Sequence, residues 1–185
     1  MSTATQNQTA EWAIDASHTN IEFAVKHLMI STVRGHFGGV EGTVTLDGDD
    51  LSTARISAEI DASTVTTRNE QRDGHLRSAD FFDVENHPKL TFRSTSVDVV
   101  SEDELKVTGD LTIRGTTQPV TLDVELEGRG SDPWGNDRIG FTATTKIRRS
   151  EFGLTWNQVL ETGGVMVSED IRIRIESELV RPQAQ

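Results

Sequence analysis

The sequence predicts an all-β fold: an antiparallel barrel of about eight strands. Apolar and polar residues alternate with period two over most of the chain, which is typical of strands that bury one face. Short clusters rich in Gly, Asp, Asn and Thr separate these segments and predict turns. About eight strands in one domain favour a closed barrel, because closure removes exposed sheet edges.

The alternation is visible in each predicted strand in turn. After Phe92 the apolar residues change parity to Val97 and Val99, which predicts a β-bulge near Ser94–Ser96. The apolar residues that define the strands are, in order, Trp12 and Ile14; Ile21, Phe23 and Val25; Val40, Val44 and Leu46; Ile56, Ala58 and Ile60; Leu90 and Phe92; Leu105, Val107, Leu111 and Ile113; Val120, Leu122, Val124 and Leu126; Ile139, Phe141, Ala143 and Ile147; and Ile171, Ile173, Ile175 and Leu179.

One stretch near residues 67–82 interrupts the alternation and predicts a short helix. Thr67 and Glu70 have the spacing of a capping box, and the segment to Arg77 can continue as a helix. Its apolar content is low and Gly74 weakens it. We therefore expect this segment on the surface or across a mouth of the barrel.

The length of 185 residues predicts one domain with its own core. The patterned region runs over residues 11–181, and the polar ends, 1–10 and 182–185, are expected to be flexible tails. The first residues carry neither the basic nor the apolar part of a secretory signal, so a cytoplasmic location is expected.

Composition excludes several classes of function. Lys and Arg number 18 against 30 Asp and Glu, so the net charge of −12 repels phosphate backbones and nucleic acid is not an expected partner. The chain has no Cys, which excludes disulfides, zinc fingers and thiol nucleophiles. No apolar run approaches the length of about 20 residues that a transmembrane helix needs.

No motif predicts catalysis, a metal or a cofactor. The five histidines form no His-x-x-x-His or His-Glu-x-x-His pair, and no Gly-x-Ser-x-Gly elbow is present. A cluster of basic residues, Arg68, Arg72, His75 and Arg77, stands out in this acidic chain. It has two interpretations: salt bridges with the neighbouring acidic residues, or a clamp for an anionic head group at the barrel mouth.

The predicted inward faces consist mainly of Val, Ile, Leu and Ala. An eight-stranded barrel either fills its interior with side chains or holds one small ligand. Residues of this medium size are compatible with both arrangements, and the sequence pattern does not separate them.

A series of motifs in a fixed order spans roughly residues 11 to 180. The motifs are WAID at 12–15, SHTNIEFAVKH at 17–27, VRGHF at 33–37, RDGHLRSADFF at 72–82, HPKLTF at 87–92, VTGDLTIRG at 107–115, PV at 119–120 and IRRSEFG at 147–153. In this combination the chain resembles the YceI-like family of polyisoprenoid-binding proteins. Two positions depart conservatively from the family's pattern: Glu151 stands where Asp is common, and Thr19 where Ser is commoner.

The resemblance implies an extended, lipocalin-like, eight-stranded antiparallel barrel whose long apolar channel takes an isoprenoid chain. Family members are often homodimers, so a homodimer is expected, and many are periplasmic. The implied function is non-enzymatic binding, carriage or sequestration of a long-chain isoprenoid lipid of the polyprenyl phosphate or isoprenoid quinone type. No cofactor is expected beyond this lipid ligand.

The candidate binding residues are apolar residues for the hydrocarbon chain and hydrogen-bond donors for the head group. Arg34, Arg72 and His75 are the head-group candidates. Two other hypotheses stay open: an enzyme that acts on an isoprenoid or other apolar substrate with acid and base residues at the mouth, and a solid barrel that serves as a dimeric interaction module. The channel candidates are Phe23, Val25, Val44, Ile56, Ile60, Phe92, Leu111, Ile113, Phe141, Ile147, Phe152 and Trp156.

Overall fold

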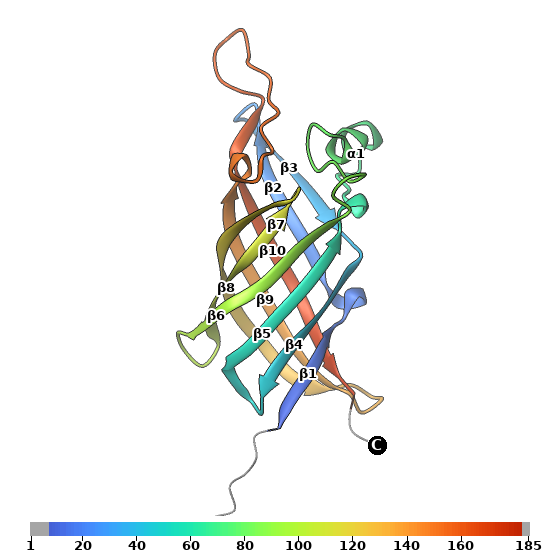
Figure 1. Ribbon diagram of the computed structural model, residues 1–185, viewed down its shortest axis with the longest axis vertical. Helices are drawn as coiled ribbons and strands as arrows, with labels where there is room; N and C mark the ends of the chain where they lie inside the picture. The colour runs from blue at the N-terminus through green and yellow to red at the C-terminus, as the bar shows by residue number, and fades with distance from the viewer. Residues whose placement is uncertain (1–7, 183–185) are drawn as a thin grey trace, which may run out of the picture.

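The computed structural model describes residues 8–182 as ten strands, one α-helix and three 3-10 turns (Figure 1). The first strand begins two residues before the predicted start of the domain. None of the described helices is long and apolar enough to cross a membrane. The elements are β1 (Thr9–Ile14), η1 (Ala16–His18), β2 (Asn20–His27), β3 (Ser31–Phe37), β4 (Val40–Asp47), β5 (Asp50–Asp61), η2 (Ala62–Thr64), α1 (Glu70–Arg77), β6 (Lys89–Val99), β7 (Glu104–Ile113), β8 (Thr116–Ser131), β9 (Asp137–Arg148), η3 (Arg149–Phe152) and β10 (Val167–Arg181).

Eight of the strands form a closed antiparallel barrel, as predicted. The order β1-β4-β5-β6-β7-β8-β9-β10 returns to its start because β1 also pairs with β10, through Ala13 with Val180 and Ile14 with Leu179. β2 continues along the same side of β10 beyond β1, and β3 pairs with β2. The two extra strands therefore lengthen one end of the barrel wall.

Two local predictions have different outcomes. The β-bulge is confirmed, since the register between β6 and β7 shifts between Ser94 and Ser96. The helix is present, but the predicted capping box is wrong. Asn69 caps α1 by accepting from the Arg72 N–H, whereas the Thr67 N–H and hydroxyl both donate to the carboxylate of Asp73. The Thr67 hydroxyl is therefore engaged by Asp73, and Asn69, two residues later, is the residue that caps the helix.

The connections divide between two ends of the barrel (Figure 1). At one end lie α1 and the loop between β9 and β10, together with the β2–β3 turn. The strand ends nearest the two termini of the chain lie at the other. This end with α1 is called the α1 end below, and the opposite end is called the terminal end.

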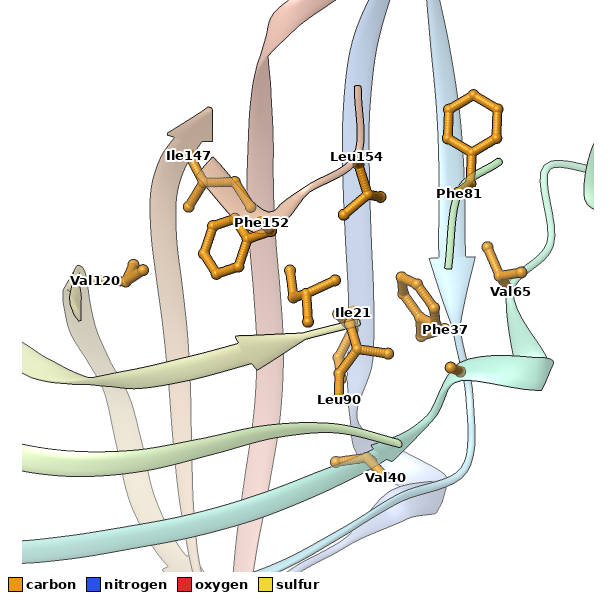
Figure 2. Packing of buried hydrophobic residues seen from close by; sticks show 12 residues of the cluster. Ile21, Phe37, Val40, Val65, Phe81, Leu90, Val120, Ile147, Phe152 and Leu154 are labelled. Atoms are coloured by element: carbon orange, nitrogen blue, oxygen red, sulfur yellow. The ribbon is translucent and has the colours of Figure 1, made fainter. Parts of the chain in front are cut away.

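The buried side chains form two clusters, one toward each end. The cluster at the α1 end includes Ile21, Phe37, Phe81 and Phe152 (Figure 2). The cluster at the terminal end consists of Trp12, Val44, Leu46, Ile139 and Leu179. The outer faces carry the charges: in β8, exposed Asp123, Glu125 and Glu127 alternate with partly buried Leu122, Val124 and Leu126.

The seam where β1 meets β10 is held by the side chain of Arg138 on β9. Its Nη1 donates to Asp15 Oδ2 at 2.8 Å and to Glu178 Oε2 at 2.9 Å, and its Nε donates to Asp132 Oδ2 at 3.0 Å. Hydrogen bonds from Ser17, Arg138 and His18 hold the pKa of Asp15 well below its usual value. The pKa of Asp132 falls to about 2, chiefly through Asn136 and also through Arg138. One guanidinium thus joins β9, β10 and the segment after β1.

These depressed pKa values predict a loss of stability in acid that depends on Arg138. Folded-state pKa values below the unfolded value of about 3.9 stabilise the protein above that pH, and the contribution is lost as the pH falls toward the folded values. We expect Arg138→Gln to lower the free energy of unfolding most at pH 7, with the gap from wild type shrinking toward pH 2. Urea unfolding over a pH series measures this gap.

The matched control is Arg174→Gln, because Arg174 pairs with exposed Glu176 on the same strand. Exposed pairs of this kind contribute little to stability, so the control should follow wild type at every pH. A gap for Arg138→Gln that stays constant with pH would show that Arg138 acts through packing and not through the carboxylates.

Candidate functional site

A cavity of about 470 Å³ occupies the inside of the barrel. It reaches from Leu46, Leu51 and Leu179 at the terminal end to Trp156 and Met166 at the α1 end. The volume lies within the range of roughly 300–1,000 Å³ typical of small-molecule sites. The barrel is therefore hollow, which contradicts the hypothesis of a solid barrel.

The twelve predicted channel residues all line this cavity. They come from six strands and the β9–β10 connection, and inward parity brings the strand residues together. They are Phe23, Val25, Val44, Ile56, Ile60, Phe92, Leu111, Ile113, Phe141, Ile147, Phe152 and Trp156.

Two glycines in the barrel wall keep phenylalanine rings close to the strands. Gly35 on β3 lies opposite Phe23 on β2, and a Cβ on Gly35 would meet the Phe23 ring at 2.2 Å. A Cβ on Gly109 would meet the Phe92 ring at 2.4 Å. Each ring therefore occupies space that a side chain would take on the neighbouring strand. Sequence reasoning missed this role, because the pattern within one strand does not show which residue the neighbouring strand places opposite it.

Three aromatic rings lie together at the α1 end of the cavity. His75 on α1 meets Phe81 edge to face at 5.0 Å between centroids and Trp156 at 4.7 Å, and Phe81 lies 5.4 Å from Trp156. The three residues come from α1, the segment after it and the β9–β10 loop. His75 Nε2 is also 2.8 Å from Asp80 Oδ2. This aromatic cluster joins two separate loops across the mouth.

Arg72 also lines the cavity at this mouth. Its Nε donates to Thr67 Oγ1 at 2.7 Å and its Nη2 to the Thr67 carbonyl at 3.2 Å. Among the described residues its Nη1 has no hydrogen-bond partner. Arg72 therefore combines a fixed orientation with a remaining donor.

The salt-bridge interpretation of the basic cluster holds in part. His75 pairs with Asp80, but Arg77 instead donates to the carbonyls of Ser63 and Val65. Asp73 is buried; burial raises its pKa, but the hydrogen bonds from Thr67 and Thr66 outweigh this and keep the pKa below its usual value. The other described contacts of the basic cluster therefore hold the segment around α1 together. Arg72 is the arginine of this cluster that also lines the cavity at the mouth.

Arg34, the third head-group candidate, does not line the cavity, so the structure does not bring it together with Arg72 and His75. Its neighbours Val33 and Gly35 face the interior of the barrel, so Arg34 points outward from β3. Its side chain is 60% exposed, with Nε 3.6 Å from Glu22 Oε1. Arg34 was a candidate because a head group needs hydrogen-bond donors, but strand parity places this residue on the outside.

Arg149 is a site residue that sequence reasoning missed. Its buried guanidinium donates to the carbonyls of Leu154 at 2.9 Å, Trp156 at 2.7 Å and Ser168 at 2.9 Å. Burial lowers its pKa, and nearby Glu169 opposes that shift. Arg149 thereby holds the loop that carries Trp156. A charged residue at the inward parity of Ile147 was the signal that could have identified it.

One group of ligating side chains lies outside the cavity. Asp15, His18 and Glu178 bring potential metal-binding atoms within 4.8 Å of one another. The guanidinium of Arg138 already bonds to both carboxylates of this group. The cluster is therefore accounted for as part of the barrel seam.

Comparison with known proteins agrees with this architecture. Residues 12–179 match the model of the YceI-like domain. The chain belongs to the YceI-like family. A UPF0312 protein of Staphylococcus aureus (strain USA300) is 40% identical over 168 residues, which cover 90% of this chain and 95% of that protein.

Solved structures share the YceI-like barrel. The Campylobacter jejuni YCEI protein superimposes with a TM-score of 0.74 at 31% identity, covering 85% of this chain and 90% of its own. Burkholderia cenocepacia BcnA gives a TM-score of 0.77 at 21% identity, covering 89% and 98%. A polyisoprenoid binding domain from Saccharophagus degradans gives 0.66 at 17% identity, covering 95% and 100%. At these identities the last two show the fold alone.

The close approach of Gly35 and Phe23 predicts a substitution that narrows the channel of this YceI-like protein. Gly35→Ala should push the Phe23 ring toward the cavity and destabilise the protein by about 1–3 kcal/mol through overpacking. Adding Phe23→Leu should restore much of this stability. Chemical unfolding of the single and double variants measures the coupling.

Gly74→Ala is the matched control, because a Cβ at Gly74 on α1 meets nothing within 4 Å. This change should leave stability unchanged or raise it by up to about 1 kcal/mol. Full additivity of Gly35→Ala and Phe23→Leu would contradict the proposed contact.

Proposed function

We propose that this protein binds a long-chain isoprenoid lipid, of the polyprenyl phosphate or isoprenoid quinone type, with its hydrocarbon chain inside the barrel. The observation that carries the proposal is the apolar cavity that extends from one end of the barrel to the other. Membership of the YceI-like family supports it, as does the likeness in fold to a domain described as polyisoprenoid binding.

The physics of the channel suits a hydrocarbon chain. Removal from water stabilises each buried CH₂-sized group by about 0.8 kcal/mol, and this gain needs no directional partner. A chain several isoprene units long can therefore offset the cost of immobilising itself. Lining by Val, Ile, Leu and Phe side chains meets this requirement, and a bound lipid would be carried or sequestered without chemical change.

The head group would lie at the α1 end, beside Arg72 and His75. A guanidinium donates well to phosphate oxygens, and the Nη1 of Arg72 is available for such a bond. The aromatic cluster of His75, Phe81 and Trp156 supplies a flat apolar surface where the chain would enter. Arg34 does not line the cavity and is not proposed as a head-group ligand.

The enzyme alternative rests on His75 and Asp80, which bind each other at the mouth. No observation favours a reaction over binding, so catalysis is not part of the proposal. Homodimer formation and a cytoplasmic location stay predictions from the sequence and the resemblance.

Native mass spectrometry and solvent extraction of freshly purified protein test the proposed ligand. We expect a bound lipid with an isoprenoid fragmentation pattern. Protein that is reproducibly free of lipid, and that also fails to bind added polyprenol in a fluorescence assay, would overturn the proposal.

Arg72→Ala tests the position of the head group. We expect roughly tenfold weaker binding of polyprenyl phosphate, since the variant loses a charge-assisted hydrogen bond, and little change for neutral polyprenol. Arg34→Ala is the matched control, because Arg34 lies outside the cavity. This variant should bind both lipids as wild type does. Equal losses for the two lipids would place the head group elsewhere.

A further inference from the structure

The α1 end of the barrel exposes apolar side chains on two loops. Met29 and Ile30, in the turn between β2 and β3, are 66% and 83% exposed, and Val159 and Val165, in the β9–β10 loop, are 79% and 38% exposed. Large apolar residues exposed together on one face mark an interaction site more often than a single exposed residue does. These four residues are called the apolar rim below.

The two loops form one surface. The Leu28 N–H donates to the Met166 carbonyl at 2.8 Å, which joins the turn to the base of the loop. Within the loop, Val159 and Val165 face each other in a β-bridge. Figure 1 shows both loops at the end of the barrel that carries α1. All four residues of the apolar rim therefore lie on loops at the α1 end of the barrel.

The backbone of the β2–β3 turn shows that its apolar residues are not there for local stability. Leu28 and Met29 have φ values of 53° and 59°. Hairpin turns usually place Gly, Asn or Asp in this left-handed region, because a side chain is strained there. Three consecutive apolar residues, Leu28, Met29 and Ile30, thus occupy a strained turn, and the last two of them are exposed to solvent.

The charge pattern is unusual for this chain. Residues 28–33 contain no charged side chain, and residues 154–166 contain only Glu161, whereas the whole chain has a net charge of −12. Lys26 lies at the base of the turn. An uncharged tip with a cation behind it suits the boundary between hydrocarbon and lipid head groups.

The rim is continuous with the channel. Met166, which directly follows Val165, and Trp156, in the same loop as Val159, both line the cavity. A lipid that leaves a membrane at this point would pass from the bilayer to the cavity along apolar side chains. Such a route avoids exposure of its hydrocarbon chain to water.

We propose that the apolar rim docks this protein on the surface of a lipid bilayer, with the channel mouth facing the membrane, so that the isoprenoid chain passes directly between bilayer and barrel. The inference rests on the proposed function for its cargo. The docking itself depends on Met29, Ile30, Val159 and Val165, which lie outside the bulk of the barrel.

Flotation of the full-length protein with phosphatidylcholine vesicles tests the docking. Wild type should float with the vesicles, and the double variant Ile30→Ser/Val159→Ser should bind roughly tenfold more weakly because it loses apolar area at the interface. The matched control is Val99→Ser/Val100→Ser, since these residues are 51% and 56% exposed in the β6–β7 turn, away from the mouth. The control should float as wild type does. Wild type that stays in solution, or a control that loses as much binding, would overturn the proposal.

Uptake of a fluorescent polyprenol separates docking from ligand binding. When the probe is offered from vesicles, it should enter the double variant Ile30→Ser/Val159→Ser, called the rim variant, about tenfold more slowly than wild type. When the probe is offered from dilute ethanol, it should enter both proteins at the same rate. Uptake from ethanol with no rim effect on uptake from vesicles would overturn docking and leave the proposed function standing. Flotation without uptake by either route would overturn the proposed function and leave docking standing.

Sedimentation velocity tests a different occupant of the same surface. The rim variant and wild type should have the same oligomeric state. If the variant alone becomes monomeric, the rim is an interface between copies of this chain and the docking proposal is overturned.

Discussion

The closure of the barrel between β1 and β10 is the constraint on which the rest of the structure depends. Among the described residues, Ala13 pairs with Val180 and Ile14 with Leu179, and the adjoining Asp15 N–H donates to the Glu178 carbonyl at 2.9 Å. The hydrogen bonds of Arg138 to Asp15 and Glu178 reinforce it from the side. Without closure the inward faces would form an open sheet, and the cavity that they share would not exist.

Closure alone does not leave a cavity, and the interior side chains decide how much space remains. Phe23 and Phe92 would obstruct the channel if they extended toward its centre. Gly35 and Gly109 let these rings lie against the wall instead. The channel is thus created by pairs of residues on neighbouring strands, one large and one without a side chain.

The α1 end combines rigid supports with exposed apolar groups. Arg149 and Asp73 are buried and hydrogen-bonded to the loops that form the mouth. Around these supports lie the aromatic cluster at the mouth and the exposed residues of the β2–β3 turn. This arrangement holds the mouth in position while its rim stays available to a partner, which accords with a lipid ligand and with docking at a bilayer.

The sequence by itself determined the fold class, the pattern of every strand except β3, the bulge in β6 and the inward set of channel residues in the strands. Each of these follows from period-two alternation, which is a local property that neighbouring residues display directly. The same parity, applied to Arg34 and Arg149, would have placed the first outside and the second inside. The capping of α1 was predicted wrongly, because the hydrogen bonds of Thr67 go to Asp73 and so depend on how the loop folds back.

Only the tertiary structure decided whether the barrel is hollow and which cations face its mouth. Side chains of medium size either fill a barrel or leave a channel, and the outcome depends on distances between strands far apart in the chain. The contact of Gly35 with Phe23, the ties of Arg149 to the β9–β10 loop and the joining of the two rim loops through Leu28 and Met166 are all of this kind. Alternation specifies which way a side chain faces, but the space that it meets there is set by packing.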